Sequence, residues 1–422
     1  MIPWDAPVAA GPIHATVSVP GSKSASARAL VLAALAKGPG QLTGLLAARD
    51  TRLMRQALTD LGAHFSDSGP ATVQVEPAHD LRAATGSIDC GLSGTVMRFV
   101  PAVAVLAPGT TRFHGDEAAG QRPVGPLLAA LSELGAGVRG RSLPFAITGR
   151  RGFPGGEVTL DSSESSQFVS ALLLAGARYR AGLVVHHRGP AIPSRPHLDM
   201  TVAMLQSRGV AVNQPEPDTW VVQPGPIQGI REVVEPDLTN AATVAAAALV
   251  TGGRVTTPWP GRTVQAADAL LAVLAAFGAR IERGHEEVTI DGSDGLRGAQ
   301  VDLSQVSEMT CVAAALAALA PGPSVIGGVA HIRGHETDRL AALARELTAR
   351  GGRVSETADG LRIDPAHLEG GTWCTYADHR MAHAGALIGL AVPGVRLDDV
   401  ACTTKTLPDF VGLWTSMLGD AR

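Results

Sequence analysis

ALTDLGAHF, residues 57–65, reads as the end of a helix, a glycine and the start of a strand. The same pattern recurs along the chain at ALSELGAGV (130–138), MLQSRGVAV (204–212), LAAFGARIE (274–282), LTARGGRVS (347–355) and LWTSMLGD (413–420). The glycines of these six copies follow one another at intervals of 68 to 74 residues. Six tandem units of about 71 residues therefore account for nearly all of the 422 residues.

Each unit contains two different helices. The Ala-rich segments, such as AATVAAAALV (241–250) and CVAAALAALA (311–320), are apolar on every side and should be buried. The other helices are amphipathic, as at residues 53–61, and should cover a sheet. Short extended runs such as TVQV (72–75) and FAIT (145–148) lie between helices. The pattern predicts an α/β fold built from β-α-β-α-β-β repeats.

A chain of this length should form more than one hydrophobic core, and six units divide naturally into three per domain. No residues after Gly419 remain to complete the sixth unit, so we expect the N-terminal run HATVSVP (14–20) to supply its final strand. The repeats therefore predict two α/β domains of three units each. Residues 21–235 form a continuous domain, residues 1–20 with 236–422 form a discontinuous one, and the functional site lies in the cleft between them.

Composition excludes several classes of protein. With 18% charged and 45% apolar residues, the chain is not dominated by disorder. The longest Ala/Val/Leu run, 312–320, is short for a membrane span, and MIPWDAP at the N-terminus lacks the features of a signal peptide. The four cysteines lie far apart and form no CxxC pair, which fits reduced thiols better than a disulfide or zinc framework. We expect a cytoplasmic monomer that binds neither membranes nor nucleic acid.

Polar residues gather where strands lead into helices. Before the buried helices, they recur every 70 to 72 residues at Lys23, Ser93, Ser165, Asp237, Glu308 and Asp378. Before the amphipathic helices, they recur every 69 to 73 residues at Arg49, Arg122, Arg195, Gln265, Glu336 and Lys405. Both series should lie at one end of the fold. In the alternative interpretation, the serines and aspartates at these junctions only cap their helices.

Helix N-termini attract anions. The net charge of −4 excludes a generally basic surface, but the junctions carry a local set of cations: Lys23, Arg28, Arg122, Arg339, Arg380 and Lys405. Hydroxyl and amide groups in SSESSQ (162–167) suit phosphate, and arginine pairs suit carboxylates. We therefore expect two small anionic substrates.

Metal and nucleotide cofactors are not expected. The pairs His331/His335 and His379/His383 have the i, i+4 spacing of metal ligands on a helix, but neither has a third ligand in an HExxH arrangement. PGSKS (20–24) lacks the glycine and lysine order of a Walker A loop, and no GxGxxG run is present.

At these junctions the sequence closely resembles the 5-enolpyruvylshikimate-3-phosphate synthase family, over nearly the whole chain. The resemblance rests on motifs that are specific in combination: PGSKSASARAL (20–30), GLSGTVMRF (91–99), QRPVG (121–125), SSQF (165–168), SRPH (194–197), RGHETDRL (333–340), YADHRMA (376–382) and TTKTLPDF (403–410). It implies an inside-out α/β barrel of two domains, each threefold repeated, which closes over shikimate 3-phosphate and phosphoenolpyruvate.

The resemblance also implies roles for individual residues. Shikimate 3-phosphate would be bound by Lys23, Ser24, Arg28, Ser165, Ser166, Gln167, Ser194, Glu308 and His335. Phosphoenolpyruvate would be bound by Lys23, Gly94, Arg122, Gln167, Arg339, Arg380 and Lys405. Gly94 should leave the enzyme open to the inhibitor glyphosate, although Phe99 stands at a position that is often proline.

The implied reaction is an addition followed by an elimination. The 5-hydroxyl attacks C2 of phosphoenolpyruvate while its methylene is protonated, and the tetrahedral intermediate then expels phosphate. Glu336 would transfer the methylene proton, Glu308 would accept the hydroxyl proton, and Lys23 would stabilise developing charge.

Besides Phe99, the sequence departs from the family pattern at four positions: Glu308 replaces the usual Asp, His335 a Lys, His331 a frequent Asn and Ala27 a common Asn. Because a histidine changes charge near neutrality, His335 could alter the pH profile.

Two alternatives remain open. UDP-N-acetylglucosamine enolpyruvyl transferase shares the repeats, but it typically carries a Cys before its RPV segment, where this chain has GDEAAGQRPVG (115–125). A sixfold DNA-clamp ring is a binding protein of another class. Its hole-lining helices need exposed Lys and Arg, whereas the matching helices here are mostly Ala, Val and Leu.

Overall fold

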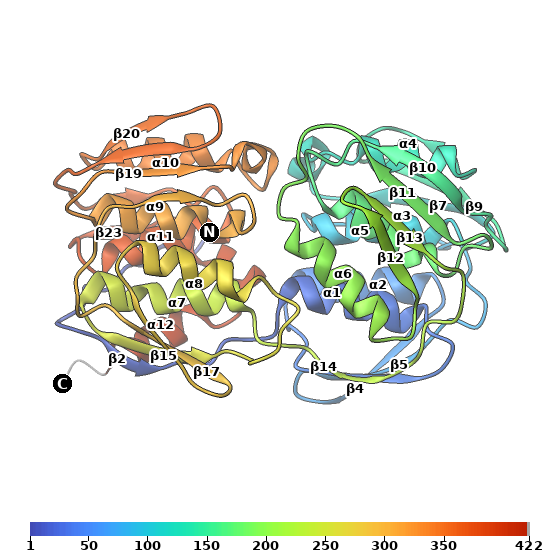
Figure 1. The fold of residues 1–422 in the computed structure, drawn as a ribbon, viewed down its shortest axis with the longest axis horizontal. Coiled ribbons are helices and arrows are strands. Elements are labelled where there is room, and N and C mark those ends of the chain that lie inside the picture. Colours follow the sequence, from blue (N-terminus) through green and yellow to red (C-terminus); the bar gives the residue numbers. More distant parts are fainter. Residues whose placement is uncertain (420–422) are drawn as a thin grey trace. The chain divides into compact units, whose positions relative to one another are not determined.

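The computed structural model describes residues 1–419, which form two compact units. Unit 1 comprises Met1–Pro20 and Pro236–Arg422, and unit 2 comprises Gly21–Glu235. Sheets surround buried helices in both units (Figure 1). Within the described part of the chain, every helix is too short or too polar to cross a membrane.

Unit 2 contains three four-stranded sheets of identical topology. In strand order they are β14-β3-β5-β4, β6-β7-β9-β8 and β10-β11-β13-β12. In each sheet the first two strands are parallel and the other neighbours are antiparallel. The strands are β3 (Gly40–Thr43), β4 (His64–Gly69), β5 (Thr72–Glu76), β6 (Ser87–Asp89), β7 (Gly109–His114), β8 (Gly137–Arg139), β9 (Phe145–Gly149), β10 (Gly156–Leu160), β11 (Leu183–His187), β12 (Val212–Glu216), β13 (Thr219–Val222) and β14 (Arg231–Val233).

The Ala-rich and Leu-rich helices form the centre of unit 2. α1 (Lys23–Ala34), α3 (Gly94–Ala104) and α5 (Gln167–Gly176) contact one another, and nearly all of their residues are buried. α2 (Arg49–Asp60), α4 (Gly125–Glu133) and α6 (Pro196–Gln206) bury one face each, and the short 3-10 helix η1 (Glu117–Gln121) precedes α4. The inside-out repeat fold predicted from the sequence is therefore confirmed.

Unit 1 repeats this plan. Its sheets are β18-β19-β21-β20, β2-β15-β17-β16 and the three-stranded β22-β23-β1. The strands are β1 (Trp4–Asp5), β2 (His14–Thr16), β15 (Arg254–Pro258), β16 (Arg280–Arg283), β17 (Glu287–Asp291), β18 (Gln300–Asp302), β19 (Ser324–Gly327), β20 (Arg353–Glu356), β21 (Leu361–Asp364), β22 (Gly371–Trp373) and β23 (Val395–Leu397).

The three buried helices of unit 1 also contact one another: α7 (Leu238–Thr251), α9 (Thr310–Leu319) and α11 (His379–Gly389). The outer helices are α8 (Ala267–Ala276), α10 (Arg339–Thr348) and α12 (Phe410–Leu418). Three 3-10 helices precede α9, α10 and α12: η2 (Ser307–Met309), η3 (Ala330–Gly334) and η4 (Val400–Lys405).

The repeated glycine has a backbone function. All six glycines that end the outer helices have positive φ angles, between +75° and +115°. Residues with a Cβ rarely adopt this conformation, whereas glycine does so readily, and it lets the chain leave the helix and enter the next strand. This requirement explains why the repeat is visible in the sequence.

The N-terminal strands lie differently from the expectation. The sixth sheet is completed by β1, whose Trp4 pairs with Leu397, and not by the run 14–20. Strand β2 instead lies parallel to β15 in the sheet of the fourth repeat. Elsewhere the strand before a buried helix joins the sheet that follows that helix, as β6 joins β7. At these two places the partners are exchanged: β2 precedes α1 but pairs with β15, whereas β14 precedes α7 but pairs with β3.

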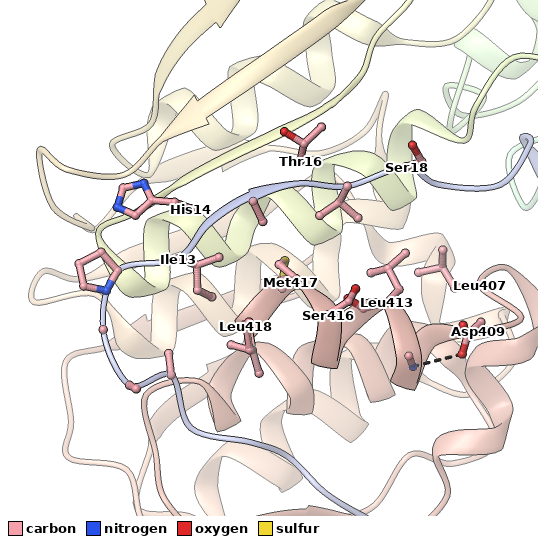
Figure 2. A pocket seen from close by; sticks show the side chains of 18 of the residues that line it. Ile13, His14, Thr16, Ser18, Leu407, Asp409, Leu413, Ser416, Met417 and Leu418 are labelled. Atoms are coloured by element: carbon pink, nitrogen blue, oxygen red, sulfur yellow. Dashed lines mark hydrogen bonds between the residues drawn. The ribbon is translucent and has the colours of Figure 1, made fainter. Parts of the chain in front are cut away.

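A large groove lies on α12 in unit 1 (Figure 2). It is lined by residues 9–18, by Pro20 and by α12 residues such as Leu413 and Met417, and its volume is about 1100 Å³. The outer helices α8 and α10 contact strands β16 and β20 of their own repeats, whereas α12 contacts β2. The residues predicted for substrate binding and catalysis are all absent from the groove lining, so the candidate active site lies elsewhere.

Candidate active site

In unit 2, Gly94 and Arg122 lie against each other. A Cβ built on Gly94, the first residue of α3, would lie 3.0 Å from Nη2 of Arg122. Arg122 follows η1, is 8% exposed and donates from Nη1 to the carbonyl of Leu92 over 3.1 Å. Glycine is therefore what allows a guanidinium group to lie over the start of α3.

Arg98 connects this pair to Gln167, and its role was missed in the sequence. Its Nη1 donates to Oε1 of Gln167 over 2.9 Å, and its Nε and Nη2 donate to the carbonyl of Pro123. The ring of Phe168 lies 5.4 Å from its guanidinium carbon. Arg98 lies one helical turn after Gly94 within GLSGTVMRF, and that spacing is the signal that could have identified it.

Ser24 and Arg28 lie with α6. Ser24 Oγ is 3.5 Å from Nε2 of His197, and Arg28 Nη2 donates to the carbonyl of the same histidine. Arg28 is 1% exposed and also bonds Thr201 and Ser170. Its guanidinium thus ties α1 to α5 and α6 and has a structural role besides any contact with substrate.

The other predicted residues of unit 2 lie at helix starts. Lys23 is the first residue of α1, directly after the capping residue Ser22. Ser165 Oγ accepts from the backbone N–H of Gln167 over 3.3 Å, and Ser166 directly precedes α5. Ser194 precedes α6, and its φ of +50° is unusual for a residue with a side chain.

In unit 1, Glu336 lies between two cations. Lys405 Nζ donates to Glu336 Oε1 over 2.6 Å, and Arg339 Nη2 donates to Glu336 Oε2 over 3.1 Å. The three side chains are at most 12% exposed. Low exposure strengthens these charge-assisted bonds, so the carboxylate is held in one place.

Asp378 holds the arginines of this group. Arg339 donates from Nε and Nη2 to the two oxygens of the buried Asp378, over 2.8 and 3.2 Å. Burial alone would lower the pKa of Arg339, but Asp378 and Glu336 outweigh it and raise the pKa, so Arg339 stays charged. Asp378 also accepts from the backbone N–H of Arg380, whose Nη1 bonds Asn240 Oδ1 over 3.2 Å.

The two histidines that distinguish this chain lie beside the same group. Arg339 Nη1 lies 3.1 Å from Nδ1 of His335, and because an arginine only donates, Nδ1 must accept. Neutral His335 therefore carries its hydrogen on Nε2. The ring of His331 contacts that of His335 at 5.7 Å, and burial is the main cause that lowers the pKa of His331, partly opposed by Glu308.

Several junction residues have local roles. Ser93, Asp237 and Asp378 cap α3, α7 and α11, as the capping interpretation predicts. Arg49 and Arg195 form ion pairs with Asp116 and Asp218.

Over residues 1–419, no cluster of three or more His, Cys, Asp or Glu side chains is arranged to hold a metal ion. His379 and His383 contact each other edge to face inside the core of unit 1.

Comparison with known proteins places this arrangement in a family. The model of the family described as EPSP synthase (3-phosphoshikimate 1-carboxyvinyltransferase) matches residues 8–414. The chain belongs to the EPSP synthase family. It is accordingly a transferase of the shikimate pathway, which serves aromatic amino acid biosynthesis, and it moves the carboxyvinyl group of phosphoenolpyruvate to shikimate 3-phosphate. Neither the UDP-N-acetylglucosamine enzyme nor a DNA clamp is favoured.

Solved structures have the same fold. EPSP synthase from Acinetobacter baumannii is 24% identical, with a TM-score of 0.82 over 98% of both chains. The enolpyruvyl transferase NikO from Streptomyces tendae is 21% identical, with a TM-score of 0.77 over 97% of this chain and 96% of its own. At these identities the likeness concerns the fold alone.

Proposed function

We propose that the family reaction is carried out by the residues predicted from the sequence, divided between the units by task. In unit 2, the start of α1 with Lys23, Ser24 and Arg28, the start of α5 and Ser194 bind shikimate 3-phosphate. Helix starts and hydroxyl groups suit a phosphate group. Ser165, Ser166 and Gln167 supply such donors at α5, and Glu308 and His335 of unit 1 bind the same substrate.

Phosphoenolpyruvate is held by the cations that the sequence predicts for it. The set is Lys23, Arg122, Arg339, Arg380 and Lys405, together with Gln167 and Gly94. The contact between Gly94 and Arg122 supports this role. A planar guanidinium group that lies over the start of a helix can form bidentate hydrogen bonds with a carboxylate or a phosphate.

We assign the proton steps to the two carboxylates that the sequence predicts for them. Glu308 takes the proton of the 5-hydroxyl as its oxygen attacks C2 of phosphoenolpyruvate, while Glu336 transfers a proton at the methylene. The tetrahedral intermediate then loses phosphate while its methyl group returns a proton to Glu336, which restores the methylene. Lys23 and the nearby arginines stabilise the charge on the departing phosphate.

One observation carries this proposal above the others: Glu336 is bonded by Lys405 and Arg339 at once. The two bonds hold the carboxylate in one place in a weakly exposed site, and a group that transfers a proton to a particular carbon must be positioned in this way. His335 contributes a neutral Nε2–H donor, because Arg339 occupies its Nδ1.

Deuterium incorporation tests the proposed reaction. In D₂O, the wild-type chain with both substrates should yield product that carries deuterium in its methylene, measured by mass spectrometry. Glu336→Gln should lower the rate of incorporation at least as much as turnover. Turnover without deuterium in the methylene would exclude protonation at that carbon.

We further propose that the chain acts as a monomer in the cytoplasm. The four cysteines are free thiols, and Cys90 and Cys311 are buried, as in proteins from reducing compartments. Sedimentation at micromolar concentration should give the mass of a single chain, and a dimer mass would contradict the proposal.

A further inference from the structure

The loop that leads into α11 has a strained backbone. Tyr376 and Ala377, between β22 and α11, have φ angles of +55° and +54°. Residues with a Cβ rarely adopt this left-handed conformation, and two in succession are rarer still. Such a conformation persists only where surrounding contacts impose it.

The contacts that hold it come from Asp398, which accepts from the backbone N–H and the hydroxyl of Thr375 over 2.9 and 2.8 Å, and from Glu346 on α10. The hydroxyl of Tyr376 donates to Glu346 Oε1 over 2.7 Å, and the backbone N–H of Cys374 donates to Glu346 Oε2 over 3.0 Å. Glu346 is 4% exposed and is paired with Arg350 over 3.0 Å. Burial, followed by the bond to Glu346, raises the pKa of Tyr376, so its hydroxyl keeps the proton that it donates.

The same helix holds the other end of the loop. Arg339 and Glu346 are seven residues apart on α10, which is about two helical turns or roughly 10 Å along one face. Arg339 bonds the carboxylate of Asp378, and Glu346 bonds Cys374 and Tyr376. The strained residues therefore lie between two points of attachment to a single helix.

We propose that Glu346 and Tyr376 are positioning residues for the transfer reaction, because their bond keeps the strained loop in the conformation that presents Asp378 to Arg339. Asp378 also receives the backbone N–H of Arg380. The strain at Tyr376 and Ala377 is thus offset by the bond to Glu346, and the result is a fixed pair of phosphoenolpyruvate-binding arginines. This inference rests on the proposed function, which assigns those arginines to phosphoenolpyruvate.

Tyr376→Phe tests the bond with the smallest change. It removes one hydroxyl, so the loop relaxes and the arginines lose their fixed positions. The KM for phosphoenolpyruvate should rise roughly tenfold, as expected for the loss of one charge-assisted hydrogen bond. The KM for shikimate 3-phosphate and kcat should change less than twofold. A Tyr376→Phe enzyme with wild-type KM values and a lowered melting temperature would overturn the proposal.

A second substitution separates positioning from a general loss of stability. Ala377→Gly removes the cost of the left-handed conformation, so the double variant Tyr376→Phe/Ala377→Gly should recover most of the wild-type KM for phosphoenolpyruvate. Ala71→Gly is the matched control, because Ala71 has a φ of +50° in a turn of unit 2. Added to Tyr376→Phe, it should leave the raised KM unchanged. Equal recovery with both glycines, or with neither, would contradict the proposal.

Arg339→Ala distinguishes failure of this inference from failure of the proposed function. If Arg339→Ala leaves the KM for phosphoenolpyruvate unchanged, the assignment of that arginine is wrong. If Arg339→Ala raises the KM and Tyr376→Phe does not, only the positioning role is wrong.

Discussion

Lys405 Nζ donates to Glu336 Oε1 across 2.6 Å, although the two residues are 69 positions apart in the chain. That interval is one repeat, and both residues belong to the series that precedes the outer helices. The fold thus brings equivalent positions of neighbouring repeats together, and here it joins the ammonium group of Lys405 to the carboxylate of Glu336. The contact follows from the architecture of unit 1.

Removal of the Lys405 charge should disable the enzyme without unfolding it. Lys405→Met leaves Glu336 with Arg339 as its cationic partner and takes one cation from phosphoenolpyruvate. We expect kcat/KM to fall by about 100-fold or more. Lys37→Met, at an exposed lysine of unit 2, should retain wild-type kinetics. Near-normal turnover by Lys405→Met would remove Lys405 from the site.

A methyl group at Gly94 should disturb Arg122. The new Cβ would lie 3.0 to 3.2 Å from guanidinium atoms, so Arg122 must move or tilt. We expect Gly94→Ala to raise the KM for phosphoenolpyruvate by about tenfold. The inhibition constant of glyphosate should rise as well, so that the inhibitor becomes weaker. Gly86→Ala is the control, because nothing lies within 4 Å of its Cβ. Unchanged kinetics in Gly94→Ala would show that Arg122 does not need that space.

His383 should limit stability in acid. It is fully buried on α11, and neither ring nitrogen has a hydrogen-bond partner within residues 1–419. Burial, and then Arg380 and Arg339, lower its pKa well below 6.5. The unfolded chain takes up this proton below about pH 6.5 and the folded chain resists it, so the free energy of unfolding falls as pH drops below that value.

His383→Met should therefore raise the free energy of unfolding by about 1 kcal/mol at pH 8, because it removes a buried unsatisfied polar group. The gain should be larger at pH 5.5, where wild type is weakened. Urea titrations at both pH values measure it, and His285→Gln, at an exposed histidine, should shift neither. A destabilised His383→Met at pH 5.5 would contradict the account.

Salt should weaken substrate capture. The candidate site gathers cations in a chain whose net charge is −4, so dissolved ions screen its attraction for two anionic substrates. Between 50 mM and 500 mM KCl we expect both KM values to rise several-fold while kcat changes little. KM values that are independent of salt would indicate that direct contacts, and not long-range electrostatic attraction, govern substrate binding.

The sequence predicted the repeat fold because its signals are backbone requirements. A left-handed glycine ends each outer helix, and Ala-rich segments suit buried helices packed against one another. It placed the run 14–20 in the wrong sheet, because β2 and β14 exchange partners: β2 precedes α1 but pairs with β15, and β14 precedes α7 but pairs with β3. That exchange depends on pairing between distant strands, which local pattern does not encode.

The candidate site residues were predicted from sequence motifs, and the structure adds contacts that the motifs do not encode. Asp378 was recognised at its junction, yet its bond to Arg339 depends on how α10 and α11 pack. Arg98 and Glu346 lie inside helices and look like ordinary charged residues in the sequence. Tyr376 and Ala377 give no local sign of a left-handed backbone, because neither is glycine or asparagine.

Release of inorganic phosphate from phosphoenolpyruvate tests the central claim most directly. The purified chain should release phosphate when shikimate 3-phosphate is added, in step with the formation of 5-enolpyruvylshikimate 3-phosphate, and should release none without an acceptor. Release that requires UDP-N-acetylglucosamine, with none for shikimate 3-phosphate, would contradict the account.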